Sequence, residues 1–119
     1  IKEWLNGEPS ESNRPALVEF FHSSSKPSTD NLTRIGSYAS KYEGRLNVVV
    51  VSKEERGKVE KTLLPSPRKY HAGLDDGTKT FDNFNVKYVP FGVLIDGKGR
   101  VVWFGNTTSL DEATIEKAL

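Results

Sequence analysis

The residues that could carry chemistry fall in two short segments of the sequence, residues 17–28 and 88–96. The first segment holds an acid, a histidine and four serines. A serine hydroxyl close to a histidine can act as a nucleophile with its base, and His22 and Ser25 are of those types. The segment lacks the glycines of a nucleophile turn, however, and no third partner stands near in sequence. We therefore rank serine hydrolysis lowest among the interpretations of this segment.

Composition limits the chemistry further. The 119 residues include no cysteine, which excludes disulfides, thiolate metal sites and a thiol nucleophile in this molecule. The two histidines, His22 and His71, stand far apart, so no metal site is expected. A net charge of +1 gives no general attraction for nucleic acid or anionic lipid. The longest apolar run, residues 48–51, is far shorter than the roughly 20 residues of a membrane span.

Apolar runs and one amphipathic stripe predict the elements that would position these residues. Residues 16–21 and 46–51 are short apolar runs, the second of them β-branched, and they predict buried strands. Between them, apolar residues spaced by three, four and three positions predict a helix that ends near Gly44. The members of this stripe are Leu32, Ile35, Ala39 and Tyr42.

The second half of the chain predicts smaller elements. The polar segment 53–64 predicts a helix that Pro65 and Pro67 would end. Residues 70–74 predict a short edge strand, and residues 78–84 predict one or two helical turns.

A hairpin and a final helix complete the pattern. Two apolar runs, 91–95 and 100–104, flank Asp96-Gly97-Lys98-Gly99, which is a strong hairpin signal. Residues 109–112 read as a capping box for a helix that runs to about residue 119. Its candidate buried residues are Leu110, Ala113 or Ala118, and Leu119.

This order of elements predicts an α/β fold. Parallel strands joined by helices, followed by an antiparallel hairpin and a closing helix, indicate a mixed central sheet with helices on both faces. The length suits a single domain over residues 1–119, with residues 1–15 as an irregular lead-in. Because the chain begins at Ile1 without a signal-like apolar region, we expect an excised domain or a mature product.

With these elements in order, the sequence resembles the thioredoxin superfamily, especially its TlpA-like and disulfide-isomerase-like branches. The resemblance rests on an apolar strand with an acid, a motif at the next helix start, a Val-Pro pair and a Leu-Ile-Asp hairpin. These are residues 17–21, 25–28, 89–90 and 94–96. The resemblance runs from about Trp4 to Leu119, and residues 53–85 are similar to the extra elements that TlpA-like proteins insert. It implies a thioredoxin-like fold.

The resemblance also implies where the family's redox cysteines would stand. Ser25 and Ser28 occupy those two positions, so a Cys-Lys-Pro-Cys motif reads Ser-Lys-Pro-Ser here. Ser24 stands where the family usually has a tryptophan. A serine hydroxyl has no thiolate-like form near neutral pH and forms no disulfide, so the chain is inactive in thiol–disulfide exchange as it stands.

Further roles follow from the resemblance alone. Glu19 falls on the family's buried acid, which implies a proton relay, and Pro90 falls on a proline preceded by a cis peptide bond. The implied substrate-binding residues are Ser24, Lys26, Pro27, Val89, Pro90 and Phe91.

Each of these residues also has an ordinary interpretation. Ser25 and Ser28 could simply cap the helix, with no further role. Glu19 could face a sheet edge or pair with a cation. Tyr88 and Phe91 could rim a peptide site or simply pack.

Three functional hypotheses remain. In the first, the natural protein is a thiol–disulfide oxidoreductase whose cysteines were replaced by engineering at Ser25 and Ser28. In the second, the serines are native and the domain is a redox-dead module that binds peptides or a partner protein. In the third, the groove is idle within a larger protein.

The resemblance implies partners and a location as well. The expected partners are extended segments of protein substrates or a redox partner protein, with no nucleic acid and no cofactor. The resemblance places the domain outside the cytoplasm, and we expect a monomer.

Overall fold

Six strands form one mixed sheet among residues 1–9, 13–63 and 69–119, which the computed structural model describes. The strands are β1 (Glu3–Trp4), β2 (Ala16–Phe20), β3 (Asn47–Ser52), β4 (His71–Leu74), β5 (Phe91–Ile95) and β6 (Val101–Gly105). The helices are α1 (Lys26–Lys41), α2 (Arg56–Leu63), α3 (Lys79–Asn83) and α4 (Glu112–Ala118), with a 3-10 turn, η1 (Thr107–Ser109). The predicted α/β class is confirmed.

The sheet runs in the order β1-β4-β3-β2-β5-β6. β3 is parallel to both of its neighbours, β2 and β4. β5 is antiparallel to both of its neighbours, β2 and β6. β3 is buried along almost its whole length, as its β-branched sequence predicts for a central strand. Because β2 and β5 are antiparallel, the end of β2 lies beside the start of β5, where Phe20 pairs with Phe91.

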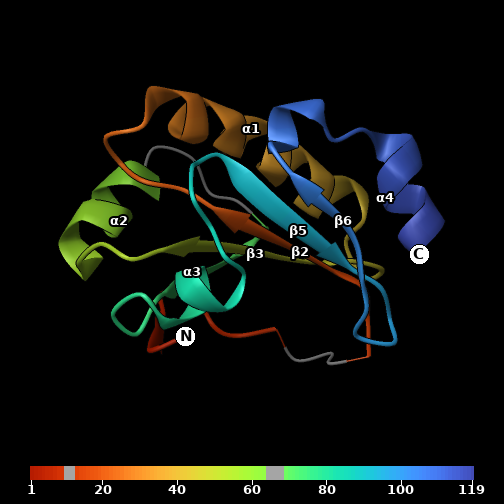
Figure 1. The fold of residues 1–119 in the computed structure, drawn as a ribbon, viewed down its shortest axis with the longest axis horizontal. Helices are drawn as coiled ribbons and strands as arrows, with labels where there is room; N and C mark the ends of the chain where they lie inside the picture. Colours follow the sequence, from red (N-terminus) through yellow and green to blue (C-terminus); the bar gives the residue numbers. More distant parts are fainter. Residues whose placement is uncertain (10–12, 64–68) are drawn as a thin grey trace.

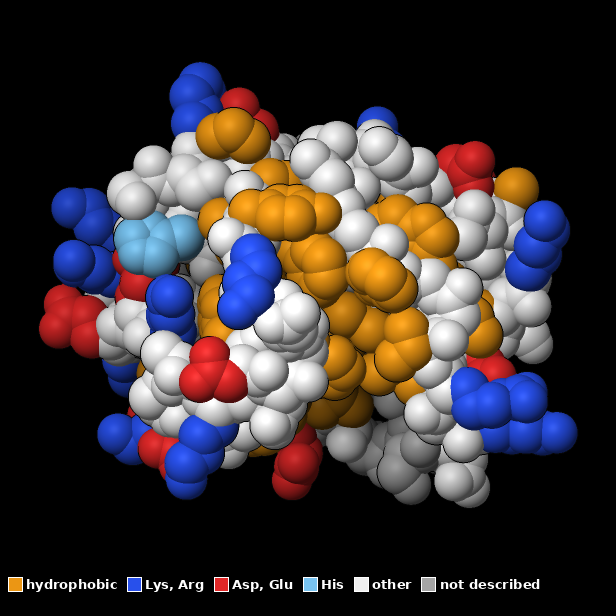
Figure 2. Space-filling view, in the orientation of Figure 1, with side chains coloured by type: hydrophobic (Ala, Val, Ile, Leu, Met, Phe, Trp, Pro, Cys, Tyr) orange, Lys and Arg blue, Asp and Glu red, His pale blue; other side chains and the backbone are white. Residues whose placement is uncertain are grey.

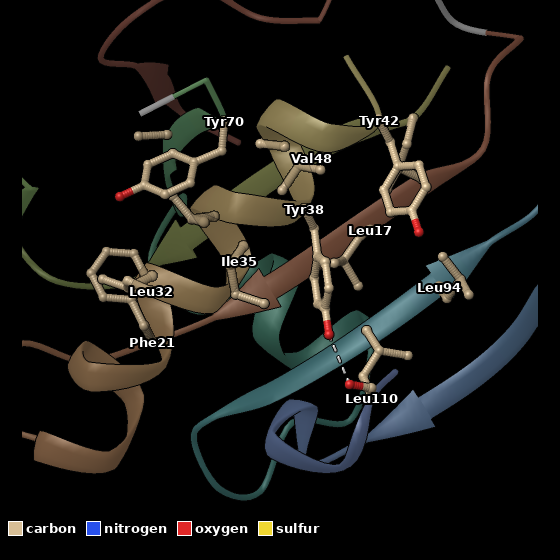
Figure 3. Packing of buried hydrophobic residues seen from close by; sticks show 14 of the residues in the cluster. Leu17, Phe21, Leu32, Ile35, Tyr38, Tyr42, Val48, Tyr70, Leu94 and Leu110 are labelled. Carbon is tan, nitrogen blue, oxygen red and sulfur yellow. Dashed lines mark hydrogen bonds between the residues drawn. The ribbon is translucent and has the colours of Figure 1, made fainter. Parts of the chain in front are cut away.

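Helices cover the two faces of the sheet unequally. Figure 1 shows α1 and α4 together on one side of the sheet and the short α3 on the other. The larger core cluster lies under α1 and α4, and Figure 3 shows its side chains converging around Ile35 and Leu17. The Tyr38 hydroxyl also donates to the Leu110 carbonyl at 2.9 Å, which ties α1 to the chain entering α4. The smaller cluster, around Phe20 and Phe81, lies under α3.

α1 forms as its stripe predicts. All four members of the stripe are buried, and Gly44 takes a left-handed φ of 84° just beyond the helix end. The hairpin at residues 96–99 is also confirmed, with Gly99 at a φ of 82°. Residues 53–85 form α2, β4 and α3 in their described part.

Two predictions at the sheet's other edge are wrong. Residues 1–15 are not wholly irregular, because Glu3 and Trp4 form β1 and pair antiparallel with β4. β4 is therefore not an edge strand. Residues 10–12 and the predicted helix stop at Pro65 and Pro67 lie outside the described residues.

The capping box is also wrong. Ser109 ends η1, and Asp111 caps α4 by accepting from the Thr114 amide at 2.9 Å. Ile115, which was not among the predicted buried residues, is the buried residue of α4. Leu110 is buried as predicted, whereas Ala113 and Leu119 are exposed and Ala118 is partly buried.

No helix among the described residues is long and apolar enough to cross a membrane.

Candidate functional site

The two predicted chemical segments meet at one cleft. The loop that leaves β2 and the loop that enters β5 lie side by side because of the β2–β5 register. Between them lies a cleft of about 320 Å³. Its lining residues are His22, Ser24, Ser25, Lys53, Phe81, Val86, Lys87, Tyr88 and Val89.

Ser25 and Ser28 are held by the start of α1. Ser25 is the N-cap, and its hydroxyl accepts from the Ser28 amide at 3.3 Å. Ser28 is fully buried, and its hydroxyl lies 3.1 Å from the His22 carbonyl while accepting from the His22 amide at 3.2 Å. Both serines therefore act as capping and loop-fixing groups, and Ser25 also faces the cleft.

The other residues of the motif point outward. Lys26 and Pro27 are exposed in the first turn of α1, and Lys26 forms an exposed ion pair with Asp30 at 3.2 Å. The first turn holds no acid, so the partial positive charge of the helix start is not neutralised there by a side chain of this turn. Pro27 lines a shallower groove of about 830 Å³ along α1 instead of the cleft.

Glu19 is buried in the middle of the sheet. Its side chain is fully inaccessible, and its Oε2 accepts from the Thr107 hydroxyl at 2.8 Å and the Asn31 amide at 3.2 Å. Its Oε1 has no hydrogen-bond partner among the described residues. Burial raises the pKa of Glu19 to about 8, although the two hydrogen bonds act in the opposite direction. Glu19 is thus neither edge-facing nor paired with a cation, and it is protonated at neutral pH.

Gly92 leaves the room that Glu19 occupies. It pairs with Glu19 across the β2–β5 ladder, and a Cβ at this position would lie 3.0 Å from Glu19 Oε1 and 2.3 Å from the Thr107 methyl. A larger residue therefore does not fit without displacing the carboxyl or η1. Sequence reasoning missed Asn31 and Thr107 as partners of the acid.

Glu54 is a half-buried acid whose side chain is 6% exposed, and the sequence analysis did not identify it. It follows β3, and its carboxylate accepts from the Ser23 amide at 2.7 Å, from the Ser23 hydroxyl and from the Ser52 hydroxyl at 2.9 Å. Burial alone would raise the pKa of Glu54, but these hydrogen bonds and nearby His22 hold it below its usual value. The position of Glu54 just after β3 could have identified it. Because β2 and β3 are parallel, they end at the same edge of the sheet, which brings the loops that follow them together.

The imidazole ring of His22 contacts Ser24, whereas Ser25 meets His22 only through the backbone, where its amide donates to the His22 carbonyl at 3.0 Å. Its Nδ1 lies 2.7 Å from the Ser24 hydroxyl and accepts from the Ser24 amide at 3.1 Å. Its Nε2 lies 3.7 Å from Glu54, which is an ion-pair distance and too long for a hydrogen bond. The His22 ring and the Ser25 hydroxyl therefore form no nucleophile–base pair among the described contacts, because the Ser25 hydroxyl caps α1. No group of three or more acidic or histidine side chains among the described residues is placed to hold a metal ion.

The opposite wall of the cleft is the segment before β5. The Val89–Pro90 peptide bond is cis, and Pro90 is buried. Neither Val89 nor Tyr88 makes a backbone hydrogen bond with another described residue. Tyr88 is 51% exposed and packs edge-on against Phe91, which is buried, at 5.4 Å between ring centroids. Tyr88 is thus a rim residue, and Phe91 belongs to the core.

No family model matches the sequence, and no curated protein matches it. Solved structures do match. A thioredoxin-like protein in its oxidized form has a TM-score of 0.82 at 24% identity, covering 98% of this chain and 88% of that chain. A thiol-disulfide isomerase from Corynebacterium glutamicum has a TM-score of 0.78 at 15% identity, covering 98% and 88%. A protein assigned as thiol:disulfide interchange protein DsbE from Chlorobium tepidum has a TM-score of 0.74 at 22% identity, covering 89% and 75%.

At such identities the likeness establishes the fold and not the activity. The match with the first of these structures covers nearly the whole chain. The chain has a thioredoxin-like fold.

Proposed function

We propose that this chain binds an extended segment of a partner protein in the cleft between the start of α1 and Val89. The observation that carries the proposal is the free backbone of Tyr88 and Val89, which has no backbone partner among the described residues and lies at the cleft. An extended peptide can pair with such a backbone edge, while apolar side chains beside the edge add affinity. Val86, Tyr88 and Val89 provide those side chains.

The same proposal includes the absence of disulfide exchange. The exchange reaction needs a thiolate that attacks a disulfide sulfur and a second thiol that resolves the mixed disulfide. Ser25 and Ser28 stand at the two positions that the resemblance assigns to those thiols, and their hydroxyls are occupied in capping contacts. With no thiol in the chain, Glu19 has no proton to relay for this reaction.

A titration tests binding. Reduced, carboxymethylated insulin B chain, which is unfolded, is added to the ¹⁵N-labelled protein, and amide shifts are followed. We expect the amides of Tyr88, Val89 and Phe91 to shift in a saturable way, while those at the far end of α1, such as Ser40, stay in place. If no amide near Val89 shifts, the binding proposal fails.

A second candidate function is disulfide exchange in a cysteine-bearing form of the domain. It is favoured by one observation: Ser25 faces the cleft as the N-cap, and Ser28 follows within the first turn. A cysteine at a helix start has a lowered pKa because of the unpaired amides there.

Restoring the thiols tests that candidate. Ser25→Cys/Ser28→Cys is expected to accelerate the reduction of insulin by dithiothreitol. Ser37→Cys/Ser40→Cys is the matched control, because it places two thiols at the same spacing on exposed positions of the same helix. Equal rates for the two variants would exclude the exchange candidate and would leave the binding proposal untouched.

Location and assembly complete the proposal. We place the domain outside the cytoplasm, which rests on the resemblance, and we expect a monomer. Sedimentation of the purified chain over a range of concentrations tests the second, since a mass that rises with concentration contradicts it.

A further inference from the structure

The cleft beside Val89 carries positive charge. Its basic lining residues are Lys53, Lys87 and His22, and no Asp or Glu is among the described residues that line it. Glu54 lies 3.7 Å from His22, but its side chain is 6% exposed and its oxygens accept from serine donors. A ligand in the cleft therefore meets positively charged side chains.

The two lysines are free to meet a ligand. Neither Lys53 nor Lys87 forms an ion pair with another described residue, and both are exposed. Lys53 is held at the cleft wall, because its Nζ lies 5.2 Å from the centre of the Phe81 ring. Asp82 on α3 does not pair with either lysine; its carboxylate accepts from the Thr78 hydroxyl at 2.9 Å.

An apolar strip continues from the cleft. Tyr88 packs on Phe91. The ring centroid of Phe91 lies 6.3 Å from that of Phe104, which is on β6 and 67% exposed. Figure 2 shows this face of the molecule with a continuous apolar surface and basic side chains beside it. Basic and apolar groups thus lie next to each other along the path that an extended segment would follow.

We propose that the cleft selects extended partner segments in which acidic residues flank an apolar or aromatic one. The carboxylates would meet Lys53 and Lys87, and the apolar side chain would lie against Tyr88 and Phe104. This proposal rests on the proposed function, since it assigns the chemistry of the segment that the cleft binds. Charge complementarity of this kind decides between partners more than it adds affinity.

Three labelled peptides test the selection. A fluorescein-labelled peptide with two glutamates around a Leu-Tyr pair is compared with peptides that carry glutamine or lysine in place of both glutamates. Fluorescence anisotropy gives the dissociation constants at low salt. We expect the glutamate peptide to bind about fivefold more tightly than the glutamine peptide and the lysine peptide to bind most weakly. The preference is expected to shrink at 0.5 M salt, because exposed charges are screened.

Variants locate the selection. Lys53→Gln/Lys87→Gln is expected to bind the glutamate and glutamine peptides equally, and Lys53→Glu/Lys87→Glu to prefer the lysine peptide. Lys98→Gln/Lys117→Gln removes the same charge from exposed positions outside the cleft and is expected to keep the wild-type preference. Equal binding of the three peptides by the wild type, or a preference that survives Lys53→Gln/Lys87→Gln, overturns the charge selection while peptide binding itself stands. Failure of all three peptides to bind overturns the selection together with the proposed function.

Discussion

Glu19 and Glu54 titrate in opposite directions, although burial acts to raise the pKa of both. Glu19 is the last residue but one of β2, receives hydrogen bonds on one oxygen from two neutral side chains, and has a pKa raised to about 8. Glu54 sits in the loop after β3, receives a backbone amide and hydroxyl donors on both oxygens, and has a lowered pKa.

The difference shows what decides ionisation at this site. Burial acts to raise the pKa of both groups and is the largest single influence on each. The charged form survives at Glu54 because donors reach both of its oxygens and His22 lies 3.7 Å away, whereas Glu19 Oε1 receives none from the described residues. Glu19 is also the more deeply buried of the two residues. Deeper burial and fewer donors therefore act together to keep Glu19 neutral, whereas donors on both oxygens keep Glu54 ionised.

The largest expected effect is the pH dependence that Glu19 imposes on stability. Below about pH 4.5 the carboxyl is protonated in the folded and unfolded states alike. Between about 4.5 and 8 only the folded state keeps the proton, so the free energy of unfolding falls as pH rises, and above that range the loss is complete. The full loss is on the order of 5 kcal/mol.

Urea unfolding of the wild type and Glu19→Gln between pH 4 and 9 measures this effect. Glutamine keeps the shape and the acceptor oxygen but cannot ionise, so we expect its curve to lack the decline. The two proteins are expected to differ least near pH 4 and most near pH 9. Parallel curves across the whole range would show that Glu19 ionises in the folded state with an ordinary pKa.

Sequence reasoning identified Glu19 but neither its partners nor Glu54, and the reason is the range of the contacts. The strand that carries Glu19, the α1 stripe and the 96–99 turn are specified by residues close together in sequence. Asn31 and Thr107 reach Glu19 from positions 12 and 88 residues away, and Ser23 reaches Glu54 across 31 residues. Such meetings leave no periodic signal, because they depend on how the elements pack.

The errors at the element ends have local causes. β1 is two residues long and exists through its pairing with β4, so it has no pattern of its own. At α4, Ser109 and Asp111 are both good capping types, and Asn106 caps the η1 turn that contains Ser109. With two candidate caps two residues apart, the prediction chose Ser109, whereas Asp111 caps α4.

The next effect concerns the space around Glu19. Gly92→Ala is expected to lower the free energy of unfolding by about 3 kcal/mol, because the new Cβ would meet the Thr107 methyl and Glu19 Oε1. Gly57→Ala is the matched control: its Cβ would have only Glu55 Oε1 within reach, at 4.0 Å. We expect the control to be unchanged or stabilised by up to about 1 kcal/mol. Thermal and urea unfolding at pH 5 measure both variants, and a Gly92→Ala protein as stable as the control contradicts the tight packing.

Glu54 provides the opposite pH response. Because its folded-state pKa is lowered, its stabilising contribution is present above the usual pKa of 4.5 and is lost as pH falls through the folded-state value. Glu54→Gln offers one acceptor oxygen in place of two, so we expect a loss of about 2 kcal/mol at pH 6. The gap between wild type and variant is expected to close toward pH 3. A gap that stays constant down to pH 3 would mean that charge contributes nothing at this position.

The smallest effect isolates one hydrogen bond at the neutral acid. Thr107→Val keeps the side-chain shape but removes the hydroxyl that donates to Glu19 Oε2 at 2.8 Å. Because that hydrogen bond favours the charged form, its loss is expected to raise the pKa of Glu19 further above 8. The chemical shift of the Glu19 carboxyl carbon, followed by NMR from pH 5 to 10, reports the change directly. Thr114→Val at the exposed start of α4 is the control and is expected to leave this titration in place. If Thr107→Val lowers the pKa of Glu19, this hydrogen bond does not favour the charged form, and the contrast with Glu54 rests on the deeper burial of Glu19 and on the other contacts of Glu54.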